Sequence, residues 1–389
     1  MATIFPGSAS VGQIFNGYTF DGTVWNINGI DLTENYLEES SASAIYLNKV
    51  SASSTYLTQV NASSTYAPIV PAVQTGFRNA IINGDFGINQ RGFTSLTTNG
   101  AYGFDRWLTH ASSGGTYSAQ TFTPGAAPVS GYEGKNFYRI VTTGQSGADV
   151  YTSFEQRIED VRTFAGQTVT VSFWAKAASG TPKVSIEFIQ NFGTGGSSTV
   201  LTNASTVTLS TSWARYSVSV AIPSISGKTI GTSSYLSSPL FWVSAGTTFA
   251  SRANSIGIQS NTFDFWGVQV EAGSTATPFE QRPIGIELEL CQRYYINRKS
   301  DFAVINGFTT ANAQKWFSVS LPTTMRAAPN FTPFDGAGNS GRCTTIDGAG
   351  TGTNNVTPSY QTSYPTLVSV LFTGTNTGLS FGYIAEIEL

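Results

Sequence analysis

Charged residues are scarce in this chain, and the shortage excludes several classes of protein. Of 389 residues, 20 are Lys or Arg and 23 are Asp or Glu, so the formal net charge is −3. No cluster of Lys and Arg creates a local field that would attract a nucleic acid or an anionic membrane. No run approaches the ~18 consecutive apolar residues of a membrane helix. We therefore expect no nucleic-acid partner and no membrane insertion.

Histidine and cysteine are almost absent. His110 is the only histidine, and the two cysteines, Cys291 and Cys343, lie far apart in the sequence. Two thiols leave a single disulfide possible but do not make a disulfide framework. Zinc and the other metals that bind through His and Cys are excluded.

We expect no secretion signal at the N-terminus. Its first residues, MATIFPGSASVGQ, contain neither a basic region nor an apolar one. Yet the composition, with 40 Gly and 13% aromatic residues, suits β-rich domains with neutral polar surfaces, as in extracellular proteins. A protein made in the cytoplasm and released by lysis as part of a particle reconciles the two observations.

Ser and Thr are abundant, and near the N-terminus they form a repeat of ten residues. One tyrosine marks each repeat: Tyr36, Tyr46, Tyr56 and Tyr66. On an α-helix ten residues advance about 1000°, roughly 80° short of three turns, so the tyrosines would spiral and form no stripe. The apolar surface of each repeat is too small for a single chain to form a hydrophobic core with it. We expect residues 34–75 to form a narrow stalk, helical or β, in which three chains wind together. The alternative is a disordered linker.

Residues 76–285 are predicted to form one all-β domain. Apolar and polar residues alternate in four segments, 168–176, 183–189, 213–220 and 263–270. This period of two turns one face of each segment inward. Short strands separated by Gly-rich turns are typical of a two-sheet sandwich of the jelly-roll type.

Two smaller β regions complete an all-β fold class. Residues 1–33 contain short Gly-punctuated segments with several aromatic residues, which indicates a small β module that attaches the chain to another molecule. Residues 286–389 contain further alternating segments around a Gly-, Thr- and Asn-rich stretch, 335–357, that we expect to be a loop. We expect this last region to be a small distal β domain.

Several segments resemble a domain common in bacteriophage tail-fibre and appendage proteins. They are RNAIINGDFGINQRG at 78–92, YGFDRW at 102–107, VSFWAKA at 171–177, FWGVQVEAGSTATPFE at 265–280, ELCQRYY at 289–295 and MRAAP at 325–329. Each segment alone is weak, whereas their order is specific. The resemblance covers about residues 77–330 and, more loosely, the C-terminal end. The Tyr-centred repeat is also similar to the stems of phage fibres.

The resemblance implies a homotrimeric virion fibre whose jelly-roll domain is similar to carbohydrate-binding modules. The N-terminal module would attach to another virion protein, of the tail or of the capsid. The distal β domains would bind polysaccharide on the host surface. Two alternatives stay open: a structural head-decoration fibre or tail adaptor without a receptor role, and a glycan depolymerase.

No catalytic residue is predicted, and we expect the protein not to be an enzyme. His110 has no nucleophile elbow near it, so we expect it in a surface loop. The acidic cluster at 155–160 offers the carboxylates that a glycosidase needs. Arg157 and Arg162 lie in and beside this cluster, which favours ordinary salt bridges instead.

Aromatic side chains are the candidates for sugar binding, because sugar rings have apolar faces that pack on them. Trp242, Tyr235 and Tyr151 lie in Ser- and Thr-rich contexts and are predicted to bind the ligand at the surface. Tyr360 and Tyr364, near the loop at 335–357, are further candidates. The tryptophans in alternating patterns are expected in the core: Trp107, Trp174, Trp213 and Trp266.

A structural Ca²⁺ is the one metal that the resemblance suggests. Jelly-roll carbohydrate modules often hold a calcium ion between their first and last strands, and Asp85 and Glu271 occupy comparable places near the two ends of the domain. Oxygen-only ligands suit Ca²⁺. The alternative is that Asp85 caps a turn and that Glu271 pairs with Arg282 or another arginine. No other cofactor is expected.

Overall fold

The computed structural model describes residues 7–15, 17–23, 25–27, 77–129, 132–306, 313–346, 352–358, 360–374 and 378–389. The chain divides into two compact units, Met1–Val73 and Gln74–Leu389. The Tyr repeat lies outside the described residues, so the stalk stays a prediction. Almost all regular elements in the described part of the chain are strands, which confirms the all-β fold class.

The described part of the first unit is a small antiparallel sheet in the order β1-β2-β3. Its strands are β1 (Ile14–Phe15), β2 (Tyr18–Phe20) and β3 (Trp25–Ile27). The ring of Trp25 lies 6.2 Å from that of Phe15 and 5.4 Å from that of Phe20. This aromatic group supports the predicted β module, whose attachment role stays a prediction.

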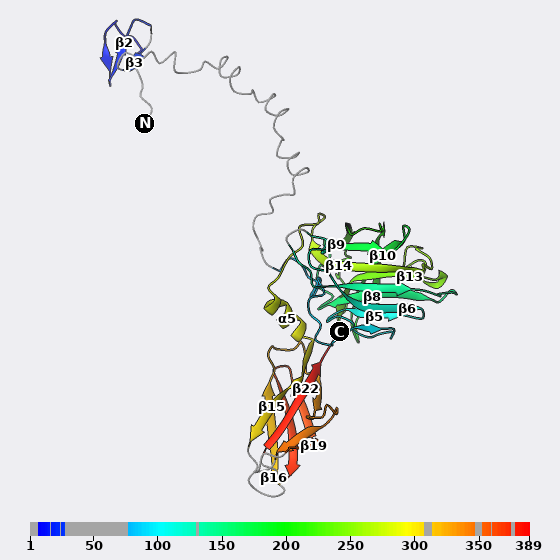
Figure 1. Ribbon diagram of the computed structural model, residues 1–389. Helices are drawn as coiled ribbons and strands as arrows, with labels where there is room; N and C mark the ends of the chain where they lie inside the picture. Colours follow the sequence, from blue (N-terminus) through cyan, green and yellow to red (C-terminus); the bar gives the residue numbers. More distant parts are fainter. Residues whose placement is uncertain are drawn as a thin grey trace. The chain divides into compact units, whose positions relative to one another are not determined.

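The second unit begins with a sandwich of two antiparallel sheets (Figure 1). The first sheet has the order β11-β10-β13-β8-β5 and the second the order β12-β9-β14-β7-β6-β4. The five strands of the first sheet are β5 (Leu108–Ala111), β8 (Tyr151–Ile158), β10 (Lys183–Asn191), β11 (Val200–Thr208) and β13 (Tyr235–Ala245). The six strands of the second are β4 (Ser95–Leu96), β6 (Gly115–Thr121), β7 (Asn136–Thr142), β9 (Thr168–Ala177), β12 (Ala214–Ala221) and β14 (Asn261–Ala272).

The core of the sandwich lies between the two sheets. Phe154 of the first sheet is within 4.9 Å, ring centre to ring centre, of both Phe241 and Phe265. Burying one such side chain stabilises the fold by roughly 1.5–3 kcal/mol. Trp107 and Trp266 are fully buried, as predicted, whereas Trp174 and Trp213 are only partly buried against this core.

A short helix, α5 (Ile284–Gln292), follows the sandwich and leads to the C-terminal domain. The predicted boundary between residues 285 and 286 therefore falls inside a helix. One sheet of this domain consists of β15 (Tyr295–Asn306), β22 (Gly378–Glu386), β18 (Cys343–Ile346) and β19 (Gly352–Val356), with β17 (Asn330–Phe334) paired to β22. The other has the order β16-β21-β20: β16 (Ala313–Ser320), β21 (Leu367–Gly374) and β20 (Tyr360–Tyr364).

The stretch at 335–357 is not only a loop, as the composition had indicated. It contains β18 and β19, because strand pairing satisfies backbone groups whatever the polarity of the side chains. Cys343 on β18 is buried in the core of the domain, and both cysteines are free thiols. No helix in the described ranges is long and apolar enough to span a membrane.

The last residues of the chain run back against the sandwich. Glu388 pairs with Arg91 and with Arg106 of the sandwich, and Arg106 is fully buried. The main-chain oxygen of Leu389 accepts hydrogen bonds from Tyr102 Oη, at 3.0 Å, and from Arg157 Nη1, at 2.8 Å. The two domains of this unit are therefore joined by buried charges as well as by α5.

Candidate functional site

A cavity of about 200 Å³ lies on the first sheet of the sandwich, on the face turned away from the core. Strand β8 shows why this face is polar. Tyr151, Ser153, Glu155 and Arg157 alternate along β8 and all line the cavity. The residues between them, such as Phe154, point into the core.

Strand β13 forms the next part of the wall. Tyr235 lines the cavity near one end of the strand, and Leu240 and Trp242 line it farther along. An odd-numbered residue and two even-numbered residues thus face the same side of the strand. The reason is that the pairing of β13 with β8 shifts between Ser237 and Leu240. This irregularity moves the even-numbered residues onto the cavity face.

A segment after β13 closes one side. It starts with a single 3-10 turn, η1 (Thr247–Phe249), and places Phe249 and Arg252 in the cavity wall. Phe249 packs on Tyr151, with ring centres 4.8 Å apart, and on Trp242, at 5.7 Å. These residues belong to a small apolar cluster separate from the sandwich core.

One end of the cavity holds a buried carboxylate, that of Glu155. Its Oε1 atom lies 2.8 Å from Arg157 Nε and 3.1 Å from His110 Nε2, while Ser237 donates to Oε2. Burial alone would raise the pKa of Glu155. The hydrogen bond from His110 and the charge of Arg157 outweigh it and lower the pKa to about 2. The guanidinium of Arg157 lies 4.5 Å from the ring centre of Tyr235.

The other end repeats this arrangement with different residues. Arg252 donates from Nε and Nη2 to the two carboxylate oxygens of Glu187, at 2.9 and 2.8 Å. Trp242 Nε1 donates to the same carboxylate at 3.1 Å, and the guanidinium lies 5.1 Å from the Trp242 ring centre. The cavity thus has two units of the same composition, each made of an aromatic ring, an arginine and a buried glutamate.

The structure brings together all three residues predicted to bind the ligand: Tyr151, Tyr235 and Trp242 line the same cavity. Whether they bind one stays a prediction. Trp242, however, is not the surface side chain that its Ser-rich context suggested, because it is only 2% exposed, in the wall behind Arg252, Phe249 and Tyr151. Tyr151 and Tyr235 are the half-buried rings that an incoming ligand can reach.

Sequence reasoning missed the polar part of the site. Glu155 and Arg157 were expected to form a salt bridge, which the structure shows, but their spacing of two also placed them on one strand face. His110 was expected in a surface loop and lies instead on β5, beside β8. Arg252 carried no signal, because only the chain's return after β13 brings it to Glu187.

His110, Ser237 and Glu155 are not arranged as a Ser-His-acid triad. In a Ser-His-acid triad the histidine receives the serine proton. Here His110 and Ser237 both bond to the carboxylate of Glu155, and Ser237 is fully buried. The cavity instead offers aromatic rings beside fixed hydrogen-bond donors, which suits recognition.

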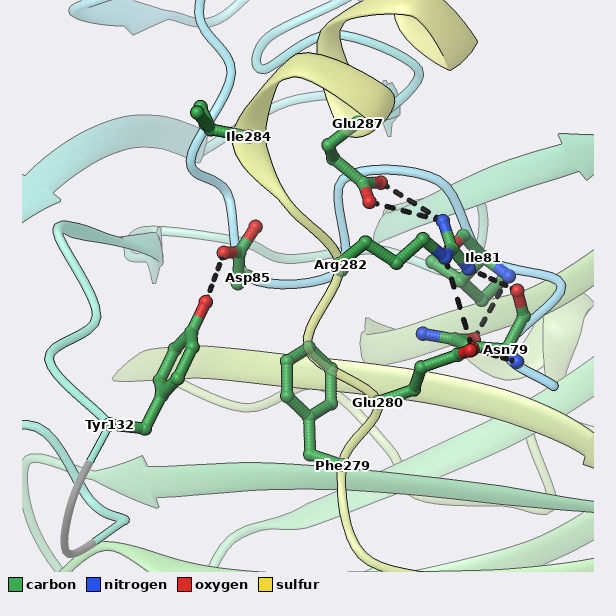
Figure 2. A pocket seen from close by; sticks show the side chains of 10 residues that line it. Asn79, Ile81, Asp85, Tyr132, Phe279, Glu280, Arg282, Ile284 and Glu287 are labelled. Carbon is green, nitrogen blue, oxygen red and sulfur yellow. Dashed lines mark hydrogen bonds and ion pairs between the residues drawn. The ribbon is translucent and has the colours of Figure 1, made fainter. Parts of the chain in front are cut away.

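The residues predicted to hold Ca²⁺ lie in different surroundings. Asp85 lines a cavity of about 20 Å³ together with Tyr132, Glu280, Arg282 and Glu287, and Glu271 does not line it (Figure 2). Asp85 Oδ2 accepts a hydrogen bond from Tyr132 at 2.5 Å. Asp85 Oδ1 accepts one from the main chain of Gly87 at 3.1 Å, as a turn cap does.

Glu271 is occupied by its own neighbours. Its two carboxylate oxygens accept hydrogen bonds from Thr277, at 2.8 and 2.6 Å, and from Gln269 at 2.8 Å. Arg282 pairs with Glu280 and Glu287 and not with Glu271, whose charge acts on another arginine, Arg215. In the described part of the chain no group of three or more His, Cys, Asp or Glu side chains is arranged to hold a metal. The calcium ion stays a prediction without a ligand set.

Arg282, which follows the last strand of the sandwich, bonds to the first segment of the sandwich. Its guanidinium bonds to Glu287 at 3.1 Å and to the main-chain oxygens of Asn79 and Ile81, as Figure 2 shows in part. Carboxylate and main-chain oxygens of this kind would also suit a calcium ion. The arginine already supplies the positive charge there.

No protein-family model matches the chain, and no curated protein matches it. Among solved structures it is similar to a family 4 carbohydrate-binding module, with 19% identity over 49% of this chain and 98% of the other and a TM-score of 0.29. It is also similar to a xylan-binding CBM22 domain from Paenibacillus barcinonensis, with 17% identity, coverage of 45% and 94%, and a TM-score of 0.29. A family 11 module from Clostridium thermocellum, in complex with a mixed-linked tetrasaccharide, shows 16% identity, coverage of 48% and 99%, and a TM-score of 0.28.

Proposed function

We propose that this protein binds a glycan in the cavity on the first sheet of the sandwich. The observation that carries the proposal is the grouping of two reachable aromatic rings, Tyr151 and Tyr235, with two arginines held in place by buried glutamates. Rings stack on the apolar face of a sugar, and fixed donors bind its hydroxyl oxygens. The volume, about 200 Å³, is below the roughly 300 Å³ of pockets for drug-sized ligands, which suits one sugar residue of a longer chain.

The wider role that we propose is that of a homotrimeric bacteriophage fibre that attaches to the virion through its N-terminal module and to the host through surface polysaccharide. Its support comes from the sequence: the Tyr repeat and the ordered segments that resemble phage appendage proteins. A single small cavity binds weakly. Three copies on one fibre raise the effective concentration and can increase avidity by about 10²–10⁴.

The experiment is a binding assay of the purified full chain on an array of bacterial surface polysaccharides. Tyr151→Ala and Tyr235→Ala should each weaken binding about tenfold, since each removes a ring at the site of contact. Tyr364→Ala provides the comparison, because Tyr364 is 57% exposed on the C-terminal domain.

Three outcomes decide the proposal. Loss of binding in the cavity variants alone supports it. Loss in Tyr364→Ala alone would place the glycan site on the C-terminal domain and contradict the cavity. Absence of binding to every polysaccharide by the full chain would contradict glycan binding and favour a purely structural fibre.

A further inference from the structure

We propose that the cavity selects an acidic glycan, one whose sugar residue carries a carboxylate. This inference rests on the proposed glycan-binding function. Its basis is a difference in exposure between the positive and negative groups of the wall. The guanidinium groups of Arg157 and Arg252 are partly exposed, whereas the carboxylates paired with them are buried.

Arg252 shows the arrangement clearly. Its side chain is 33% exposed, and that of its partner, Glu187, is 0% exposed. Nε and Nη2 of Arg252 bind Glu187, so Nη1 has no acceptor among the described residues and stays available to a ligand. The Trp242 ring behind the guanidinium keeps it in the cavity wall.

Arg157 repeats this geometry at the other end. Its side chain is 23% exposed against 4% for Glu155. Nε binds Glu155 and Nη1 binds the main-chain oxygen of Leu389, which leaves Nη2 without an acceptor in the described part of the chain. Tyr235 lies over this guanidinium as Trp242 lies over the other.

A ligand in the cavity therefore meets the positive end of each ion pair first. A ligand carboxylate would touch a guanidinium directly, whereas the side chains of Glu155 and Glu187 are only 4% and 0% exposed, so attraction exceeds repulsion. Glu155 is the one carboxylate among the described residues of the wall, and its oxygens are directed at Arg157, His110 and Ser237. A neutral hydroxyl can also accept from these donors, but hydrogen bonds between charged groups are about twice as strong.

The test uses the same polysaccharide array, with each acidic member also present after chemical reduction of its carboxylates to alcohols. Binding to an acidic member that falls about tenfold or more on reduction supports the inference. Binding to neutral members, or binding unchanged by reduction, overturns the acidic preference and leaves glycan binding intact. Absence of binding throughout overturns both.

A pair of double variants assigns the effect to the cavity. Arg252→Gln together with Glu187→Gln removes the cation without leaving a buried carboxylate unpaired. The matched control is Arg139→Gln with Asp264→Asn, which removes an ion pair of the second sheet, where Arg139 Nε lies 2.7 Å from Asp264. Only the Arg252→Gln/Glu187→Gln variant should lose its preference for the acidic polysaccharide over the reduced one. Equal loss in both double variants, or no loss in this one, overturns the assignment to Arg252.

Discussion

Buried ion pairs at single residues shape the cavity. Glu155 is enclosed by Arg157, His110 and Ser237. These contacts stabilise its ionised form and hold its pKa far below the ordinary value. The same contacts hold Arg157 in the wall of the cavity. One carboxylate thus couples the stability of the sandwich to the geometry of the site.

This coupling predicts a pH dependence. Because the pKa of Glu155 falls from the ordinary 4.5 to about 2 on folding, its contribution to the free energy of unfolding, on the order of 3 kcal/mol, is present above about pH 4.5 and is lost as the pH falls through 2. Urea unfolding between pH 6 and 2 should therefore show a smaller acid-induced loss in Glu155→Gln than in the natural chain.

An exposed glutamate serves as the control for this measurement. Glu133→Gln should follow the pH dependence of the natural chain, because Glu133 lies on the surface. If the difference in stability between the natural chain and Glu155→Gln were the same at every pH, the carboxylate would not be held ionised as described.

Among the elements, strand β22 and the residues that follow it connect the C-terminal domain to the sandwich. β22 is central in its sheet, paired with β15, β17 and β18. Glu386, the last residue of β22, and Glu388, two residues farther on, both form ion pairs with Arg91, and Glu388 also pairs with Arg106. The two glutamates differ in burial, so they offer a matched comparison.

Glu388→Gln should destabilise the protein by about 3 kcal/mol, because it leaves the buried guanidinium of Arg106, with 1% of its side chain exposed, without its anion. Glu386→Gln should cost less than about 1 kcal/mol, since the Glu386 side chain is 39% exposed. Thermal and urea unfolding of the two variants measure the difference. Equal destabilisation would show that the junction does not depend on the buried charge.

For the whole molecule, the prediction concerns the number of chains. The Tyr repeat predicts three, and the mass of the native particle should then be about three times the 41.3 kDa of one chain. Analytical ultracentrifugation at micromolar concentration measures it. Replacement of Tyr36, Tyr46, Tyr56 and Tyr66 by Ser should shift the particle toward a single chain, because it removes the recurring apolar contact.

A matched set of changes guards this prediction. Four Ser→Ala substitutions in the same repeats, at Ser41, Ser51, Ser53 and Ser63, leave the tyrosines in place and should keep the trimer. A natural chain that sediments as a monomer would contradict the stalk and favour the linker.

The sequence by itself determined the fold class and much of the strand plan. Alternation with period two located β9, β10, β12 and β14, because a strand with one buried face must alternate. It also selected Tyr151, Tyr235 and Trp242, by their polar surroundings. Local patterns of this kind are written into consecutive residues, so they can be read without coordinates.

Tertiary structure alone decided which side chains meet. The shift in pairing between Ser237 and Leu240 reversed the parity of β13 and put Trp242 in the wall of the cavity, where the sequence had suggested an exposed ring. His110, Glu155 and Arg252 come from three separate segments, and only the packing of β5 against β8 and the return of the chain after β13 join them. Contacts between distant segments depend on register and chain path, for which the spacing of residues in a sequence carries no signal.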